Sequence, residues 1–315
     1  MNLRPLGRSG IAIAPLVLGG NVFGWNVDQQ TSSAILDAFV DAGFNAIDTA
    51  DSYSRWAPGH EGGESEMVIG RWLKAGGKRD KVVIATKVGS DMGEGRTVRK
   101  DYILRAAEAS LRRLGVETID LYQTHFDDEV TPVEETLAAY ARLIADGKVR
   151  AIGASNISPA RLSASLAASK AGGLPRYESL QPLYNLADRK GFETDYAAVC
   201  RAEGIGVIPY YGLAAGFLTG KYRTPADAQQ NPSRGGKVKN YLNPRGLGIL
   251  KALDDVAARH DATPAQAALA WLIAQPAVTA PIASATSLAQ LNDIMKAPRL
   301  RLSADDLAAL DGASR

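Results

Sequence analysis

The sequence predicts an α/β fold, a (β/α)₈ TIM barrel with a β-hairpin before it and an extra helix after it. Three observations indicate this architecture. Short apolar runs of strand length alternate eight times with longer stretches of helical periodicity. Polar residues follow the ends of successive strands, where a parallel barrel carries its site. The length of 315 residues suits one barrel, so we expect residues 1–315 to form a single domain.

The first predicted element is a β-hairpin over residues 2–14. Apolar and polar residues alternate on both sides of Gly7-Arg8-Ser9-Gly10, where glycine supplies the turn. The repeating strand and helix units follow it. The predicted strands are 16–18, 46–47, 82–86, 119–123, 149–153, 179–182, 206–209 and 280–282. The predicted helices are 33–42, 64–73, 101–114, 133–146, 159–170, 195–203, 247–260, 264–275 and 288–295, with the tail helix from Ala304.

Three helix starts fit the capping-box pattern, in which a hydroxyl residue precedes an acidic or amide residue by three positions. They are Thr131-Pro132-Val133-Glu134, Thr263-Pro264-Ala265-Gln266 and Ser287-Leu288-Ala289-Gln290. In the first two, proline falls at the first helical position, where its missing N–H costs nothing. Residues 223–244 break the regular spacing and are rich in Pro, Gly, Asn, Gln and basic residues. Long connections of this kind are usually functional or mobile.

Composition excludes several functional classes. The formal net charge is +2 and basic residues form no long run, so neither nucleic acid nor an anionic membrane is indicated as a partner. A small anionic ligand remains compatible with this charge. The single cysteine, Cys200, excludes an intramolecular disulfide framework and fits a reducing compartment. There is no N-terminal signal segment and no apolar run of membrane-spanning length, so we expect a cytoplasmic protein.

The candidate site begins at the predicted strand 46–47, which ends in Asp48 and is followed five residues later by Tyr53. Alone, such a pair is more often a turn acid and a surface tyrosine. Two further strand ends change this interpretation. The strand 82–86 ends at Lys87, and His125 follows the strand 119–123. In a parallel barrel all four side chains would share one face, which solvation alone does not explain.

With these four residues, the chain resembles the aldo-keto reductase family over nearly its whole length. The family's tetrad matches Asp48, Tyr53, Lys87 and His125. Further matches are Gly153-Ala154-Ser155-Asn156, Gln181 and Gly216-Phe217-Leu218-Thr219-Gly220-Lys221-Tyr222. The resemblance implies that the hairpin closes the bottom of the barrel. It also implies an NADP-dependent oxidoreductase that reduces an aldehyde or ketone to an alcohol, and catalyses the reverse, by hydride transfer.

Each tetrad residue has a physical reason to take part in carbonyl reduction. Tyr53 would act as general acid, and the ammonium of Lys87 would stabilise its phenolate and lower its pKa. Asp48 would pair with Lys87 and keep it charged in a partly desolvated pocket. His125 would hydrogen-bond the carbonyl oxygen and orient it. No cluster of His, Cys, Asp or Glu has metal-ligand spacing, so we expect no metal.

The cofactor site has no Rossmann signature, because no Gly-x-Gly-x-x-Gly follows a predicted strand. At residues 284–287 a loop leads instead into a capped helix, whose backbone N–H groups and dipole suit a phosphate. An ordinary helix cap is the alternative interpretation. By resemblance the adenosine end of the cofactor lies there, with Thr286, Gln290 and Asp293 around it.

By resemblance, Ser155, Asn156 and Gln181 would bind the nicotinamide carboxamide, and Tyr210 would stack on its ring. The other implied cofactor contacts are Gly20, Asn21, Leu213, Lys221 and Arg234. Lys221 and Arg234 are candidates for the phosphates, although both could be solvated surface charges. The sequence departs from the family pattern at Tyr211-Gly212-Leu213, where Ser-Pro-Leu is usual, and at Ile294, where a basic residue or Asn is common. The resemblance implies that NADP(H) is preferred, and these two departures weaken that implication, so NAD(H) stays possible.

Four aromatic residues fall in loops after the first, second and fourth strands: Phe23, Trp25, Trp56 and Phe126. Several aromatic side chains at one rim would form an apolar substrate mouth. A small carbonyl or alcohol substrate with an apolar or ring portion would fit. The sequence does not choose among sugars, steroids, aromatic aldehydes and quinones.

Two other functions stay open at this point. A lysine at a barrel strand end can form a Schiff base, as in aldolases, and Lys87 is so placed, although Asp48 would raise its pKa rather than lower it. Some relatives of this fold are regulatory channel subunits that bind a nicotinamide cofactor. The intact tetrad argues against an enzymatically inactive protein.

Overall fold

The computed structural model describes residues 2–76, 78–229 and 232–315, with the backbone alone for residues 232–234. Eight parallel strands curl around one axis in the order β10-β3-β4-β5-β6-β7-β8-β9. Their bounds are β3 (Val17–Gly19), β4 (Ala46–Asp48), β5 (Val83–Val88), β6 (Ile119–Thr124), β7 (Val149–Ser155), β8 (Tyr177–Gln181), β9 (Gly206–Val207) and β10 (Ile282–Ala283).

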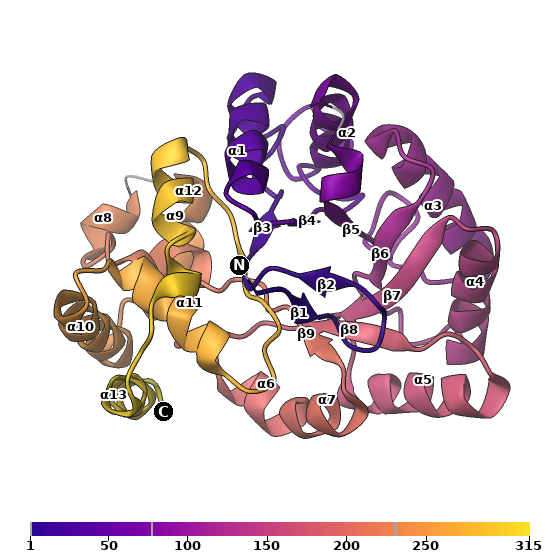
Figure 1. The fold of residues 1–315 in the computed structure, drawn as a ribbon. Coiled ribbons are helices and arrows are strands. Elements are labelled where there is room, and N and C mark those ends of the chain that lie inside the picture. The colour runs from indigo at the N-terminus through magenta and orange to yellow at the C-terminus, as the bar shows by residue number, and fades with distance from the viewer. Residues whose placement is uncertain (1, 77, 230–231) are drawn as a thin grey trace.

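Backbone hydrogen bonds join the two ends of this strand order, the regions of β9 and β10, and so close the barrel. The N–H of Thr279 donates to the carbonyl of Val207 at 2.8 Å, and the N–H of Ile282 donates to that of Pro209 at 2.9 Å. Helices surround the strands on all sides (Figure 1). The predicted α/β barrel of eight parallel strands is therefore confirmed.

The N-terminal hairpin consists of β1 (Arg4–Pro5) and β2 (Ala12–Ile13), paired antiparallel and drawn across the strands in Figure 1. Its turn needs glycine at position 7, because a Cβ there would lie 2.1 Å from the carbonyl oxygen of Glu178. Its apolar side chains join a core cluster with inward-facing strand residues such as Ala85 and Leu121. The hairpin thus fills the N-terminal end of the barrel, as predicted, and leaves the opposite end for a site.

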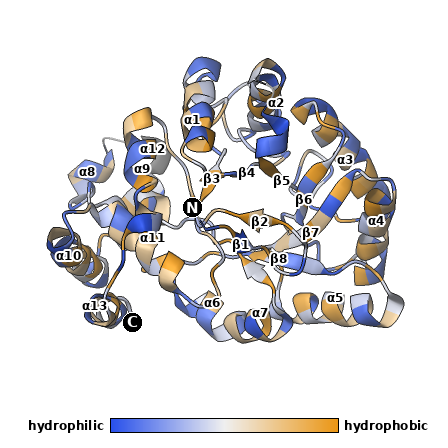
Figure 2. Ribbon diagram, viewed as in Figure 1, coloured by the Kyte–Doolittle hydropathy of each residue, from blue (hydrophilic) through white to orange (hydrophobic). Residues whose placement is uncertain are grey.

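The helices after the strands pack on the outside of the barrel through a second, larger core cluster. Most of these helices carry both hydrophobic and hydrophilic residues, with one face packed inward and the other toward solvent (Figure 2), whereas α11 is buried over almost its whole length. None of the helices within the described ranges has the length and hydrophobicity needed to cross a membrane. The helix bounds are α1 (Gln29–Asp41), α2 (Glu64–Gly76), α3 (Lys100–Leu114), α4 (Val133–Ala145), α5 (Pro159–Gly172), α6 (Lys190–Asp195), α7 (Ala197–Glu203), α8 (Pro225–Gln229), α9 (Pro232–Val238), α10 (Pro244–Arg259), α11 (Pro264–Ala274), α12 (Leu288–Ile294) and α13 (Ala304–Ser314).

Three predicted elements differ from the structure. Helix α1 begins at Gln29, before the predicted start at 33, because the Asp28 side chain caps it and accepts from the N–H of Thr31 at 2.8 Å. The predicted helix 195–203 is the pair α6 and α7, which meet at Tyr196. The irregular segment 223–244 contains α8, α9 and the 3₁₀ turn η3 (Lys239–Tyr241) in its described part. It therefore has more secondary structure than expected.

The capping prediction for α4 is wrong. The cap position is Pro132, not Thr131, and no side chain caps the helix there. The hydroxyl of Thr131 instead donates to Asp128 Oδ2 at 2.7 Å. Asp128, three residues earlier, competes successfully for this hydroxyl.

The other two predicted boxes form only their first half. Thr263 caps α11 and Ser287 caps α12, each accepting from the N–H three residues later. The reciprocal side chains go elsewhere, because Gln266 donates to Asp293 and Gln290 accepts from Thr286. Each helix start therefore has one capping bond rather than the two of a capping box.

Candidate active site

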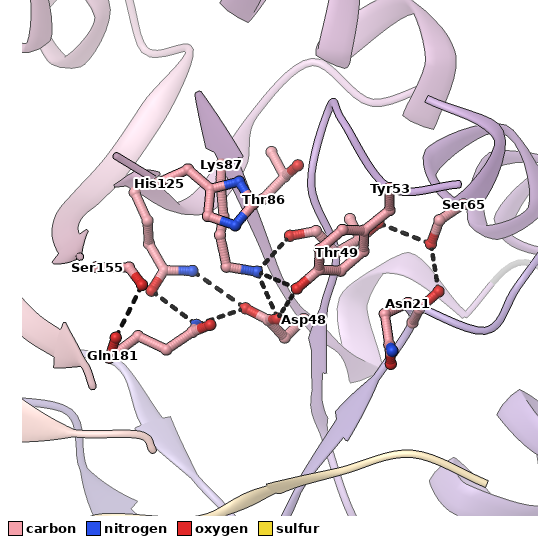
Figure 3. Close-up of polar contacts among 12 residues, drawn as sticks. Asn21, Asp48, Thr49, Tyr53, Ser65, Thr86, Lys87, His125, Ser155 and Gln181 are labelled. Atoms are coloured by element: carbon pink, nitrogen blue, oxygen red, sulfur yellow. Dashed lines mark hydrogen bonds and ion pairs between the residues drawn. The ribbon is translucent and has the colours of Figure 1, made fainter. Parts of the chain in front are cut away.

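The tetrad residues lie at the C-terminal ends of three neighbouring strands (Figure 3). Asp48 is the last residue of β4, Lys87 is the last residue but one of β5, and His125 directly follows β6. Tyr53 comes from the loop after β4. Parallel pairing places Asp48 opposite Ala85, two residues before Lys87 on the adjacent strand. Because the strands are in register, side chains far apart in sequence come together at this end of the barrel.

Lys87 is the centre of the cluster. Its Nζ lies 2.6 Å from Asp48 Oδ2, 2.8 Å from Tyr53 Oη and 2.8 Å from the carbonyl oxygen of Thr49. An ammonium has three N–H groups and no acceptor, so these three contacts use all of them. Lys87 and Asp48 are buried, with 0% and 1% of their side chains exposed. The ion pair is therefore fixed in place beside the tyrosine hydroxyl.

Two glutamine side chains hold the second oxygen of Asp48. Gln123 Nε2 donates to Asp48 Oδ1 at 3.1 Å, and Gln181 Nε2 donates to the same oxygen at 2.9 Å. Gln181 was predicted to bind the cofactor carboxamide, and in this structure its side-chain amide donates to Asp48 and to Gln123 Oε1. Gln123 was not predicted as a site residue. Nothing in the sequence pattern singled it out, and only the structure shows that this glutamine is fully buried.

The environment shifts the pKa values of three tetrad residues. Burial raises the pKa of Tyr53 well above its usual value, and the negative charge of Asp48 adds to this rise. The predicted lowering by Lys87 is therefore not what this structure gives. Burial also lowers the pKa of Lys87, with Asp48 acting in the opposite direction. Burial, then Lys87 and Arg96, lower the pKa of His125. The site thus contains a protonated phenol and a neutral imidazole.

His125 is oriented by serine hydroxyls that the sequence did not single out. Its Nδ1 lies 3.1 Å from Ser90 Oγ and 3.4 Å from Ser52 Oγ. A hydroxyl that donates to Nδ1 leaves the imidazole proton on Nε2. The ring lies edge to face with Tyr53, with 6.0 Å between centroids. His125 and Tyr53 can therefore present two N–H or O–H donors to the same oxygen atom.

The residues predicted for the nicotinamide end lie together beside His125. Asn156 Nδ2 donates to the carbonyl of His125 at 2.9 Å, and Tyr210 Oη donates to Asn156 Oδ1 at 3.2 Å. Ser155 Oγ donates to the carbonyl of Gln181 at 2.8 Å. Asn156 and Tyr210 also line a cavity of about 650 Å³ that extends to α6, and no tetrad residue is in its described lining. The structure thus brings these residues together, although their present polar contacts are with one another.

A strained turn follows β9. Tyr211, Ala214 and Ala215 adopt left-handed backbone conformations, with φ of 55°, 48° and 57°. Such conformations cost non-glycine residues roughly 1–3 kcal/mol each and cluster at ligand sites. The turn includes Leu213, and the Nζ of Lys221 lies 3.9 Å from the position that a Cβ on Gly216 would occupy. A cation beside a tight backbone turn suits a phosphate group.

The other predicted cofactor residues lie on the first and last strand loops. The N–H of Gly20 donates to the carbonyl of Asp48 at 2.7 Å, and Asn21 Oδ1 accepts from Ser284 Oγ at 2.5 Å. Asn21 is therefore next to the loop 284–287, and Figure 3 shows it near Asp48 and Tyr53. The side chain of Arg234 lies outside the described residues.

The predicted adenosine end is only partly supported by contacts. The N–H of Thr286 donates to Gln290 Oε1 at 3.0 Å, so these two residues form a closed turn. Asp293 points to α11 instead, where its carboxylate accepts from Thr263 at 3.0 Å and from Gln266 at 2.6 Å. Asp293 is thus committed to helix packing, and its predicted cofactor role has no support in this structure.

Aromatic side chains line the rim near Tyr53. Trp25 and Trp56 lie edge to face with centroids 5.4 Å apart, and Trp56 is 6.0 Å from Tyr53. The ring of Phe126 lies 4.8 Å from that of His125. Phe23 does not belong to this rim, contrary to the prediction, because it is completely buried in the core. Three of the four predicted aromatic residues therefore surround the candidate site.

A cavity of about 1100 Å³ lies far from this chemistry, near the starts of β5, β6 and β7, and Arg79, Asp120 and Arg150 are among the residues that line it. Both arginines pair with Asp120, at 2.8 and 2.7 Å. Its charges therefore serve the packing of strand starts. Across the described ranges, no three His, Cys, Asp or Glu side chains come together as a metal site.

Comparison with known proteins matches residues 15–315 to the description "Aldo/keto reductase family". An uncharacterized oxidoreductase, YrpG of Bacillus subtilis (strain 168), is 34% identical over 97% of this chain and 94% of its own length. The L-glyceraldehyde 3-phosphate reductase of Escherichia coli (strain K12) is 32% identical over 99% of this chain and 92% of its own length. Aldo-keto reductase str7 of Strobilurus tenacellus is 32% identical over 86% of this chain and 80% of its own length.

Proposed function

The chain belongs to the aldo/keto reductase family of oxidoreductases, and we propose that it reduces an aldehyde or ketone to an alcohol with NAD(P)H and also catalyses the reverse reaction. The observation that carries this proposal is the position of Lys87 Nζ, within 2.8 Å of both Asp48 and Tyr53. The ammonium of Lys87 stabilises the negative charge that develops on the Tyr53 oxygen as the phenol gives up its proton. Reduction of a carbonyl needs such a proton donor, because the oxygen becomes a hydroxyl group.

Ser155, Asn156 and Tyr210 are the residues that would hold the nicotinamide, and when bound there NAD(P)H would supply the hydride for the carbonyl carbon. As the C–H bond forms, the electrons of the C=O double bond move to oxygen, which takes the hydroxyl proton of Tyr53. Lys87 stabilises the phenolate that remains, and Asp48 keeps the ammonium charged. His125, with its proton on Nε2, donates a hydrogen bond that orients the carbonyl oxygen. Tyr53 then regains its proton from water.

The Schiff-base alternative is less compatible with this geometry. An amine attacks a carbonyl through a free lone pair, so the lysine must be neutral and accessible. Lys87 Nζ makes three hydrogen bonds and its side chain is 0% exposed. The regulatory alternative is also disfavoured, because a protein that only senses a cofactor has no need of the complete tetrad.

We expect the protein to bind a reduced nicotinamide dinucleotide, with NADPH bound more tightly than NADH. Tyr210 and the aromatic rim lie beside the proposed nicotinamide position, so binding should quench the fluorescence of the nearby tryptophans, Trp25 and Trp56. Titration with each dinucleotide would measure both affinities. Absence of quenching by either, together with no heat of binding in calorimetry, would contradict a dinucleotide site.

Lys221→Ala is expected to weaken cofactor binding more than it slows hydride transfer at saturating cofactor. A lost charge-assisted contact to phosphate costs on the order of 1.5–3 kcal/mol, which is about a tenfold to hundredfold change in dissociation constant. Lys170→Ala, an exposed lysine near the end of α5, is the matched control and should leave binding unchanged. Equal cofactor affinities for the two variants would show that Lys221 is a solvated surface charge and does not contact the cofactor. We expect Arg234→Ala to act in the same direction.

The substrates we propose are small carbonyl compounds that fit between Tyr53, His125 and the aromatic rim. One relative is named for reduction of L-glyceraldehyde 3-phosphate, a short aldehyde. A panel of aldehydes and ketones assayed for NADPH oxidation tests the proposal. Failure to oxidise NADPH with any member, while NADPH binds, would favour the regulatory function instead.

A further inference from the structure

Arg96, in the loop after β5, lies beside the candidate site and is not used by the mechanism above. Its Cζ lies 4.3 Å from the centroid of the Phe126 ring, and that ring lies 4.8 Å from the ring of His125. The guanidinium and the imidazole therefore both contact the same aromatic ring. The charge of Arg96 is close enough to be one cause of the lowered pKa of His125.

Among the residues that the structure describes, no hydrogen-bond acceptor is found for the guanidinium of Arg96. Within the described ranges, neither Arg96 nor the neighbouring Arg55 forms an ion pair, and the only described side-chain contact of Arg55 to a polar atom is with Met92 Sδ at 3.9 Å. Both arginines are exposed. A guanidinium stacked on an aromatic face keeps its edge N–H groups free, and that planar fork matches a carboxylate or a phosphate.

The carboxylates on the surrounding loops are mostly engaged elsewhere. Asp91 accepts from the N–H groups of Gly93 and Gly95 at 2.8 and 3.0 Å. Three more acids of these loops have a described partner. Glu94 pairs with Arg105, and Asp127 pairs with Arg161. Asp128 accepts from the Thr131 hydroxyl and from backbone N–H groups. In the loops after β5 and β6, Glu129 is the acid without a described partner, and it is exposed; in the loop after β4, which carries Arg55, the exposed Glu61 and the buried Asp51 have no described side-chain partner. The pKa of Asp91 is lowered first by its hydrogen bonds from Gly93 and Gly95 and further by the nearby charges of Arg55 and Arg96, so this carboxylate partly balances them. Within the described ranges it forms an ion pair with neither guanidinium, and both remain exposed.

Resting on the carbonyl reduction proposed above, we propose that Arg96, with Arg55 nearby, binds an anionic group of the substrate. The enzyme would then prefer short aldehydes that carry a carboxylate or a phosphate. His125 and Tyr53 hold the carbonyl end of such a molecule, and the guanidinium of Arg96 holds its anionic end. Trp56 and Phe126 cover the chain between them. Arg96 thereby sets specificity and takes no part in proton transfer.

The test compares matched pairs of aldehydes that differ only in charge. Succinic semialdehyde is paired with its methyl ester, and glycolaldehyde phosphate with glycolaldehyde. We expect wild-type kcat/KM to be about tenfold or more higher for the anionic member of at least one pair. Which pair shows the larger ratio distinguishes a carboxylate from a phosphate. The preference should fall as salt concentration rises, because salt screens exposed charges.

Arg96→Gln should lower kcat/KM for the preferred anionic aldehyde about tenfold to a hundredfold and change the neutral partner little. Arg99→Gln is the matched control, since it removes an exposed charge from the same loop, where Arg99 lies 3.8 Å from Asp101. Arg96→Lys keeps the charge without the planar fork and should restore part of the preference. Melting temperatures of all variants check that the loop still folds.

Two outcomes separate this inference from the function on which it rests. Turnover of neutral and anionic aldehydes at equal efficiency, or an equal loss on both in Arg96→Gln, overturns the anion site and leaves carbonyl reduction intact. No turnover of any aldehyde by wild-type protein with bound NADPH overturns the proposed function and the anion site together.

Discussion

Tyr53→Phe is expected to lower the turnover of every carbonyl substrate by at least roughly 10²-fold, and up to about 10⁴-fold, the range typical of a general acid. The substitution removes the hydroxyl that lies 2.8 Å from Lys87 and keeps the ring against Trp56 and His125. Steady-state kcat with saturating NADPH measures the effect. Cofactor affinity, from the fluorescence titration, should change by less than about twofold because no cofactor contact is removed.

A matched control for Tyr53→Phe is Tyr196→Phe. The hydroxyl of Tyr196 donates to the carbonyl of Ile157 at 2.7 Å, so this variant also loses one hydrogen bond but lies outside the tetrad. Its turnover should stay close to wild type. Retention of most of the activity by Tyr53→Phe would show that another group, or water, protonates the alkoxide.

Lys87→Met is expected to reduce turnover by a comparable factor for a different reason. The phenol remains, but the phenolate that forms during the reaction loses its neighbouring cation. Burial and Asp48 already raise the pKa of Tyr53, and removal of Lys87 should raise it further. In alcohol oxidation, where Tyr53 must act as base, the residual rate should therefore increase only at higher pH than in wild type. A pH profile of kcat in the oxidative direction measures this shift.

The same substitution should also destabilise the fold. Lys87→Met leaves the carboxylate of Asp48 buried without its cation, which typically costs roughly 3–5 kcal/mol. Asp48→Asn combined with Lys87→Met removes the unpaired charge, so the double variant should regain much of the stability but none of the activity. Thermal melts and kcat measured on the same samples separate the two effects. Recovery of activity together with stability would mean that Lys87 has only a structural role.

Sequence patterns located most of this site because its residues are few, polar and placed at strand ends. Asp48, Lys87 and His125 each follow an apolar run, and the barrel architecture implies that such positions converge. The pattern could not identify Gln123, which lies inside a strand whose other residues are mostly apolar. Ser52 and Ser90 were missed for another reason, since serine is common in loops and only the folded structure brings both hydroxyls to His125.

Other predictions failed because they depend on distance and burial rather than on residue type. The pKa of Tyr53 was expected to fall beside a cation, but burial and Asp48 raise it well above its usual value. Phe23 was placed at the rim from its position after the first strand, yet its ring packs into the core. The cap of α4 was misplaced because Asp128 competes for the Thr131 hydroxyl. Local rules cannot rank such competing partners.

The origin of the hydrogen atom on the product carbon tests carbonyl reduction most directly. Wild-type protein would be incubated with an aldehyde and NADPH deuterated at C4 of the nicotinamide, on each face in turn, and the alcohol examined by mass spectrometry. We expect one deuterium on the carbinol carbon with one labelled face and none with the other, and Tyr53→Phe should form labelled alcohol at a rate at least roughly 10²-fold lower. Alcohol that carries no deuterium from either face, or a borohydride-trapped adduct on Lys87 with no alcohol formed, would contradict hydride transfer at this site.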